Sequence, residues 1–462
     1  MPDQTMAEQF ATFAAGLRFE DVPTALVDKA KLHILDTLGC AIAPARSDSA
    51  KTILAALMRL GTAHESVAIG QAERLGLRDA ILFNGSLANT LDYDDTYIPA
   101  LNHISCGTVP LVLALASREG ASGRAMVLAY VLALEVNAHI SLAVPGASIM
   151  RRGFSPSGML NGFGNALAAG RLLGLDSSAL ITSQGLALSF MAGTLEGLSE
   201  GAWTKRLYPG GAGVAGLTSA MLAAEGFKAP SRPYEGDAGL YTVLLGPDAV
   251  VDVRLVTAGL GNHWEFAQLA IKPFPIVHHA HSVIECGIRL STDDKVQPED
   301  IKDLTVLVHA GQVARICEPV AERRHPPNAH AGLFSIYHTL ATAIVKGRLT
   351  LDETDDATLN DPTIRALRER IGYEIDPHSC FPAYFSGGLI ARLQDGRTIR
   401  HYEHYHRGSD RRPFEPGLAI DKFRVNAERL YQRDRVEALI EAVMALDGKG
   451  RPSDVTALLG EP

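Results

Sequence analysis

The chain has 462 residues, more than one hydrophobic core usually serves, so two domains are expected. Hydrophobic residues make up 47% and charged residues 21%, the balance of a globular protein that buries a large core. The net charge of −9 argues against nucleic acid or an anionic membrane as the main partner, but it allows a small cationic pocket.

The cysteines and the apolar segments bear on where the protein works. The longest apolar stretch, Ala125 to Val144, carries Glu135 and His139, which favours a buried helix over a membrane span. The first ten residues have no basic segment followed by an apolar core, as a secretion signal would have. We therefore expect a cytoplasmic protein that does not act at a membrane. Five scattered cysteines without CxxC spacing indicate free thiols in a reducing compartment: Cys40, Cys106, Cys286, Cys317 and Cys380.

The first 260 or so residues predict one helix after another. Apolar residues recur at helical spacing from Leu26 to Ile42, Val109 to Ala116 forms another apolar helix, and a further helix begins near Arg124. Two later segments, Gly158 to Leu173 and Gly211 to Glu225, are rich in glycine and alanine. Small residues let helix backbones approach closely, which suits a compact helical core.

The pattern changes near residue 266. Leu304 to Val308 predicts a strand, and Asp395-Gly396 between two β-prone runs predicts a hairpin. Helical periodicity returns from about Ile420 to Leu446. We therefore expect a mainly α protein, in which residues 1–265 and 401–462 form a large all-helical domain and residues 266–400 form a smaller inserted α/β lid domain.

An acidic cluster precedes a histidine. Asp92, Asp94 and Asp95 fall within four residues, and His103 follows. These carboxylates could bind a cation, or one could orient the histidine, or the segment could be a solvated loop. No second set of carboxylates and histidines has metal-ligand spacing, so we expect no metal here.

Two basic clusters each come before a helix rich in glycine. Arg151 and Arg152 lie ahead of the first, where they could bind a carboxylate or form a surface pair. Lys205, Arg206 and Tyr208 lie ahead of the second. Lysine and tyrosine can carry protons when their surroundings lower the pKa, although a basic turn with a buried tyrosine has the same pattern.

Three histidines follow Lys272 in the segment that opens the second domain. His278 and His281 could share one face of a helix, but no H-E-x-x-H pattern or partner carboxylate completes a zinc site with His279. The chain also has no GxGxxG after a strand, no GxxxxGK[ST] and no GxSxG. Nucleotide binding and serine-hydrolase chemistry therefore have no support.

Taken together and in this order, these clusters resemble the MmgE/PrpD family over nearly the full length. That family includes 2-methylcitrate dehydratases, cis-aconitate decarboxylases and an iminodisuccinate epimerase. The resemblance implies a large helical domain, a smaller α/β lid, a homodimer, a small polycarboxylate substrate and no cofactor. The matching stretches are Leu35–Gly39, Asn84-Gly85, Leu91–Thr96, Gly153-Phe154, Lys205-Arg206 with Gly210, Gly226-Phe227, Lys272–Pro275 with His281, and Phe334-Ser335 with Tyr337.

The chain departs from the lyase members of that family at several histidines. Asn89, Ser155 and Tyr208 stand where those members carry histidine, Ile104 replaces a proline, and His278 replaces an arginine. Elimination and decarboxylation both need a well-placed acid. The replacements favour an epimerase or racemase that removes a proton beside a carboxylate, as iminodisuccinate epimerase does. A 2-methylcitrate dehydratase or cis-aconitate decarboxylase-like lyase is the alternative, and a non-catalytic binding protein is a third.

The resemblance also suggests a role for individual residues. We expect Lys205, Tyr208 and His103 to carry protons and Asp94 to orient His103 or Lys205. We expect the substrate to be bound by a further set: Arg151, Arg152, Ser155, Arg206, Lys272, His278, His281 and Tyr337.

Overall fold

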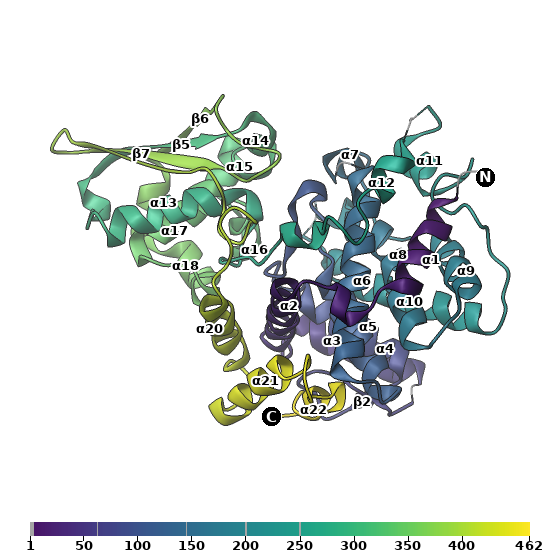
Figure 1. The fold of residues 1–462 in the computed structure, drawn as a ribbon. Helices are drawn as coiled ribbons and strands as arrows, with labels where there is room; N and C mark the ends of the chain where they lie inside the picture. The colour runs from purple at the N-terminus through teal and green to yellow at the C-terminus, as the bar shows by residue number, and fades with distance from the viewer. Residues whose placement is uncertain (1–3, 62, 145, 199–200, 249–250) are drawn as a thin grey trace. The chain divides into compact units, whose positions relative to one another are not determined.

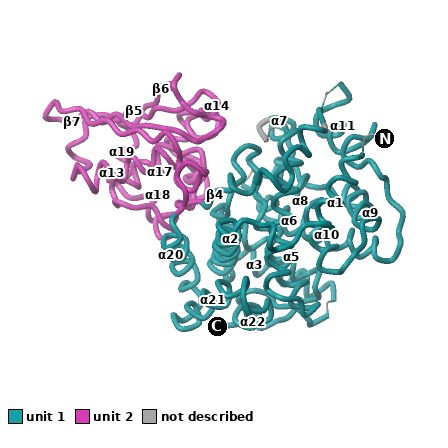
Figure 2. Tube along the Cα trace, viewed as in Figure 1, with its two compact units in different colours: residues 1–271, 415–462 teal, residues 272–414 magenta. Residues whose placement is uncertain are grey.

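The computed structural model describes residues 4–61, 63–144, 146–198, 201–248 and 251–462. Two compact units make up the chain: residues 1–271 with 415–462, and residues 272–414 (Figure 2). The sequence predicted the corresponding boundaries at 265/266 and 400/401. The chain therefore leaves the first unit, builds the second, and returns to complete the first.

Unit 1 is mainly helical (Figure 1). The predicted helices from Leu26, near Arg124 and from Gly158 are present as α2, α6 and α8, and the predicted run from Ile420 to Leu446 is divided between α20 and α21. Its helices are α1 Met6–Gly16, α2 Thr24–Ile42, α3 Asp48–Leu60, α4 Leu77–Ala88, α5 Ser105–Arg118, α6 Gly123–Leu142, α7 Gly146–Arg151, α8 Pro156–Leu172, α9 Ser177–Ala187, α10 Leu207–Ala224, α11 Leu240–Leu245, α12 Val253–Thr257, α20 Pro416–Ala427, α21 Arg433–Met444 and α22 Pro452–Ala457.

Unit 1 is not all-helical, because it also contains two short antiparallel ladders. Strand β1 (Ser66–Val67) pairs with β2 (Arg74–Leu75), and β3 (Thr96–Tyr97) pairs with β4 (Leu269–Ala270). The second ladder matters for the site, since β3 directly follows the acidic cluster. Strands of only two residues give no periodic signal, which is why the sequence did not predict these ladders.

Helix α6 is the centre of the helical core. Ser122 caps its first turn by accepting from the amide of Ala125. By length and composition α6 could cross a membrane, but 83% of its apolar window is buried inside the structure, as expected of a core helix. All five cysteines are free, as the sequence predicted, and Cys380 is the one that is not fully buried.

Glycines allow α10 to pack closely against α4, α5 and α8. A Cβ on Gly210 would lie 2.4 Å from the carbonyl oxygen of Leu82 on α4, and a Cβ on Gly216 would lie 2.5 Å from the Cβ of Asn165 on α8. Backbone atoms cannot move aside as a flexible side chain can, so these positions require glycine. The close packing holds the first turn of α10, and the basic cluster just before it, against α4.

Unit 2 is an α/β structure whose sheet has the strand order β6-β5-β7-β8. Strand β5 runs parallel to β6 and antiparallel to β7, and β7 and β8 form the predicted hairpin. Leu304, Val306 and Val308 on β5 join the core that α13 and α17 complete. The elements are α13 His281–Thr292, β5 Ile301–Val308, α14 Ala310–Ile316, α15 Val320–Arg324, α16 Ala329–Gly332, α17 Ile336–Lys346, α18 Asp356–Asn360, α19 Pro362–Arg368, β6 Ile371–Ile375, β7 Gly387–Leu393 and β8 Thr398–Glu403.

We predict that Gly210→Ala destabilises the protein, whereas Gly211→Ala does not. The added methyl group at residue 210 meets the α4 backbone, and overpacking of this kind costs about 1–3 kcal/mol. At Gly211 nothing lies within 4 Å of an added Cβ, so alanine there should gain the usual helix preference of about 1 kcal/mol over glycine. Urea unfolding of both variants measures the difference, and equal midpoints would contradict the packing described here.

Candidate functional site

The acidic cluster lies in the short connection between α4 and β3. Asp92 has a positive φ of 52°, a conformation that aspartate tolerates better than most residues. This turn separates the three carboxylates, so that they have different neighbours although they lie within four residues. Asp94 and Asp95 are fully buried. The cluster is therefore not the solvated loop that was one reading of its composition.

His103 is held beside this acidic connection by its Nδ1 atom. That atom lies 2.8 Å from the carbonyl oxygen of Asp95 and 3.2 Å from Oδ2 of Asp94. A carbonyl oxygen can only accept, so Nδ1 must carry the proton. In the neutral ring Nε2 then has the free lone pair, and it lies 3.9 Å from Oδ1 of Asp92. The arrangement makes Nε2 the atom that can take up or release a proton.

Lys205 reaches the same oxygen from the segment before α10. Its Nζ lies 2.5 Å from Oδ1 of Asp92. Burial acts to lower the pKa of Lys205, but the negative charges of Asp92 and Asp94 outweigh burial and raise it. Lys205 is thus an ammonium group at neutral pH, suited to donating a proton or to binding an anion.

Two polar side chains support Asp94 and the main chain of His103. The amide of Asn89 donates to both oxygens of Asp94 at 3.0 Å, so a neutral amide fixes the carboxylate. Asn161 on α8 donates to the His103 carbonyl oxygen at 2.7 Å, and the His103 amide donates to Ser157 at 3.2 Å. The histidine is therefore fixed through both its ring and its backbone.

Asp95 is bound by groups from two other helices. Oδ2 of Asp95 lies 2.5 Å from Nδ1 of His33 on α2 and accepts from the hydroxyl of Ser105 on α5, also at 2.5 Å. The Ser105 hydroxyl in turn lies 2.7 Å from that of Tyr130 on α6. Burial lowers the pKa of His33 even though Asp95 acts to raise it. This network fixes the base of the acidic cluster.

Lys422 contacts the acidic cluster from α20 and was not predicted as a site residue. Its Nζ donates to the carbonyl oxygen of Tyr93 at 2.8 Å, lies 2.7 Å from Oδ1 of Asp36 on α2, and lies 3.8 Å from the centre of the Tyr93 ring. Burial raises the pKa of Asp36 to about 6, although Lys422 acts to lower it. A buried aspartate inside the apolar α2 was a signal in the sequence. Lys422 gave none, because lysine is common in amphipathic helices.

The other residues predicted in unit 1 have their own partners. The hydroxyl of Tyr208 donates to the carbonyl oxygen of Thr194, and one guanidinium nitrogen of Arg152 donates to the carbonyl oxygen of Leu244. Three further placements complete the set: Arg151 donates to Ser148 at 3.0 Å, Arg206 donates to Ser49 on α3 at 2.8 Å, and Ser155 is buried directly before α8. His103 thus contacts Asp94 directly and lies near Lys205 through Asp92, whereas Tyr208 and the arginines have partners elsewhere.

In unit 2 the predicted residues begin with a buried lysine and a group of histidines. Lys272 and His278 are both buried, and neither ring nitrogen of His278 has a hydrogen-bond partner among the residues that the structure describes. The ring of His278 lies 4.4 Å from that of His281 and 5.0 Å from that of His406. Burial, with the nearby positive charges, lowers the pKa of His278 well below its usual value. Tyr337 belongs to the core of this unit, and its hydroxyl donates to the Cys317 carbonyl oxygen at 3.2 Å.

Among the described residues, neither unit shows a group suited to holding a metal ion. In the part of the chain that the structure describes, no three or more histidine, cysteine, aspartate or glutamate side chains are grouped as metal ligands would be. The carboxylates nearest to His103 already contact Lys205, Asn89 and the imidazole ring.

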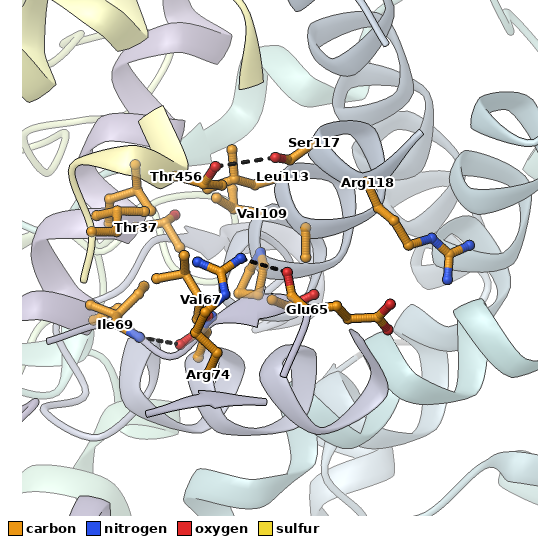
Figure 3. Close-up of a pocket in the computed structure, with 17 residues that line it drawn as sticks. Thr37, Glu65, Val67, Ile69, Arg74, Val109, Leu113, Ser117, Arg118 and Thr456 are labelled. Carbon is orange, nitrogen blue, oxygen red and sulfur yellow. Dashed lines mark hydrogen bonds between the residues drawn. The ribbon is translucent and has the colours of Figure 1, made fainter. Parts of the chain in front are cut away.

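A separate cavity of about 250 Å³ lies elsewhere in unit 1, among α2, α4, α5 and α22. Figure 3 shows polar groups of the lining that bind one another: the Ser117 hydroxyl contacts that of Thr456, and Arg74 donates to the main-chain carbonyl oxygen of Glu65. The side chain of Asn84 accepts from the main-chain amide of Ile69. None of the predicted site residues is among those that line it.

Family models cover almost the whole chain. Residues 8–251 match the MmgE/PrpD N-terminal domain, and residues 274–447 match the MmgE/PrpD C-terminal domain. The chain belongs to the MmgE/PrpD family.

Relatives in this family share about a quarter of the sequence. The chain is 25% identical to cis-aconitate decarboxylase of Homo sapiens, over 99% of this chain and 95% of the relative. It is 25% identical to cis-aconitate decarboxylase of Aspergillus terreus (strain NIH 2624 / FGSC A1156), over 97% and 94%. It is 23% identical to 2-methylcitrate dehydratase of Escherichia coli (strain K12), over 90% and 88%. These relatives are lyases, so the preference for an epimerase gains no support from them.

The buried histidines of unit 2 predict a loss of stability in acid. Burial lowers the pKa of His279 to about 3, so the unfolded chain binds its proton near pH 6.5 and the folded chain does not. This contribution to stability is complete above pH 6.5 and is lost as the pH falls toward 3, about 2 kcal/mol of it by pH 5. His279→Phe should reduce the difference between urea midpoints at pH 7.5 and pH 5 accordingly.

A second histidine provides the control. The side chain of His325 is 61% exposed, so His325→Phe should leave the pH dependence of stability as it is in the wild type. A wild-type pH dependence in His279→Phe as well would show that the folded protein protonates His279 without cost.

Proposed function

We propose that this protein is a lyase that acts on a small polycarboxylate and needs no cofactor, breaking a bond beside a carboxylate by removing carbon dioxide or water. One observation carries the proposal: Nε2 of His103 and Nζ of Lys205 both face Oδ1 of Asp92. The orientation of the histidine leaves Nε2 as its reactive nitrogen. The lyase names of the relatives, which align with nine-tenths or more of this chain, support the same reaction class.

The residues provide what either form of the reaction needs. In a decarboxylation, the bond to the carboxylate breaks, carbon dioxide leaves, and the electron pair stays on the carbon until an acid protonates it. In a dehydration, a base removes the proton beside the carboxylate, and hydroxide leaves with a proton from an acid. Neither reaction is a redox change. The ammonium of Lys205 supplies the acid, and His103 exchanges protons through Nε2.

The substrate carboxylates need cations or hydrogen-bond donors. In unit 1, Lys205 serves one of them, with Arg151, Arg152 and Arg206 as further candidates once they exchange their present partners. Unit 2 by itself has the predicted anion ligands Lys272, His278 and His281, and among the described residues neither ring nitrogen of the buried His278 has a hydrogen-bond partner. A buried polar group without a partner costs free energy, which a bound carboxylate would recover.

An epimerase is the second candidate, because Ser155 and Tyr208 replace histidines of the lyase members. A serine cannot replace an imidazolium as an acid near neutral pH. Epimerisation needs proton exchange at one carbon and no leaving group, so it makes smaller demands on the acid. The hydroxyl of Tyr208 would have to leave the carbonyl oxygen of Thr194 to take part.

Nuclear magnetic resonance in deuterated water separates these functions. The purified protein is incubated in turn with cis-aconitate, 2-methylcitrate and iminodisuccinate. We expect one of the first two to lose carbon dioxide or water, with deuterium incorporated where a carbanion is protonated. Inversion with deuterium exchange, and with no bond to carbon dioxide or hydroxide broken, would replace the lyase with the epimerase. Binding without any exchange would exclude both.

We predict that Lys205→Ala lowers kcat by about 10²–10⁴-fold, the usual effect of losing a positioned acid or base. Lys51→Ala is the matched control, because Lys51 is an exposed lysine of unit 1 that pairs only with the exposed Asp48. The control should keep the wild-type kcat. Near-normal turnover by Lys205→Ala would remove this residue from the mechanism.

A further inference from the structure

Tyr93 lies between the two aspartates that contact the proton carriers. Asp92 precedes it and binds Lys205, and Asp94 follows it and contacts His103. Any shift of the Tyr93 backbone therefore moves both carboxylates at once. Asp92 and Asp94 are the immediate neighbours of Tyr93 in the chain, so neither carboxylate can stay in place when the Tyr93 backbone moves.

Lys422 holds Tyr93 in two ways. Its ammonium donates to the Tyr93 carbonyl oxygen at 2.8 Å, and it lies over the Tyr93 ring at 3.8 Å from the ring centre. The hydrogen bond fixes the position of the Tyr93 main chain, and the cation–π contact fixes the Tyr93 ring. Both contacts come from one nitrogen atom, whose side chain is only 4% exposed.

Asp36 keeps this ammonium in place. Its Oδ1 lies 2.7 Å from Nζ of Lys422, and its side chain is 1% exposed. A buried ion pair adds little net stability, because desolvation of both charges offsets their attraction. The geometry that such a pair imposes is therefore a better reason for its presence than its contribution to stability.

We propose that Lys422 is a positioning residue, which holds Tyr93 so that Asp92 and Asp94 meet Lys205 and His103 in the reactive arrangement. The proposal rests on the proposed function for its effect on turnover, but not for its effect on the geometry of His103. Lys422 contacts Tyr93 and Asp36, so we infer that its influence on His103 and Lys205 passes through Tyr93.

The main variant is Lys422→Met, which keeps a long side chain but removes the charge and the donor. A second variant, Lys422→Met combined with Asp36→Leu, also removes the buried carboxylate that would otherwise lose its partner. Replacing both members of a buried ion pair with apolar residues is often neutral for stability. The double variant therefore separates positioning from folding.

Lys31→Met is the matched control. Lys31 is also a buried lysine of unit 1, on the same helix as Asp36, and it pairs with Asp447 at 2.8 Å and Asp28 at 3.1 Å. Both of these partners lie outside the acidic cluster. Its loss should lower the melting temperature without changing kcat.

Two measurements are made on the full chain. The first is the ¹⁵N spectrum of histidine-labelled protein, in which His103→Gln identifies the His103 signals. The second is kcat and KM on the substrate that the wild type converts. Lys422→Met and the double variant should both shift the His103 signals and lower kcat on the order of 10²-fold, with a much smaller change in KM, because a displacement of about 1 Å has such an effect on rate. Lys31→Met should change neither.

The outcomes are distinct. A double variant that recovers the melting temperature, the wild-type His103 signals and the wild-type kcat would overturn the proposal and leave the pair a structural one. Shifted His103 signals in a protein that converts none of the candidate substrates would contradict the proposed function but support the positioning role. Unchanged signals with normal lyase turnover would overturn the positioning role alone.

Discussion

The buried carboxylate of Asp95 is the constraint on which the candidate site depends. It lies in a helical core, and it is stable there because His33 and Ser105 reach it from two helices. With Asp95 fixed, its carbonyl oxygen determines which nitrogen of His103 carries the proton. The side chain of Asp95 thus anchors the loop, and its main-chain carbonyl oxygen sets which nitrogen of the His103 ring carries the proton. Nε2 of His103 is left with a free lone pair because Nδ1, the other ring nitrogen, donates to this carbonyl oxygen.

The lysines around the candidate site form ion pairs with aspartates. Asp92 neutralises Lys205, and Asp36 neutralises Lys422. The second pair is shut away from water, whereas the first is partly open, so an incoming carboxylate could compete for Lys205 but not for Lys422. Although the protein has a net charge of −9, an anionic substrate could therefore bind the Lys205 ammonium by displacing Asp92. Burial alone does not make Lys205 a base, because the negative charges of Asp92 and Asp94 raise its pKa.

Sequence patterns predicted the architecture better than the site. Periodicity identified α2, a preceding turn-rich segment identified the start of α6, glycine and alanine content identified α8, and Asp-Gly between β-prone runs identified the β7–β8 hairpin, because such signals are local. The contact of Asp94 with His103 was one of two that the family resemblance left open, the other being a contact with Lys205. The contact of Asp92 with Lys205, and the role of Asn89 as a donor, depend on which way each side chain points after the turn at Asp92. No local pattern encodes that direction.

The return of the chain from unit 2 to unit 1 has a consequence for how the protein is made. Residues 272–414 are continuous and can collapse as soon as they leave the ribosome. Unit 1, although it is translated first, lacks Lys422 until residues 415–462 have emerged. Until then, the acidic loop has been synthesised in full, but Lys422 has not yet been added to the chain to contact Tyr93. The middle of this protein can therefore fold before its beginning, and a chain that ends early would contain His103, Asp94 and Lys205 and still lack the lysine that holds Tyr93.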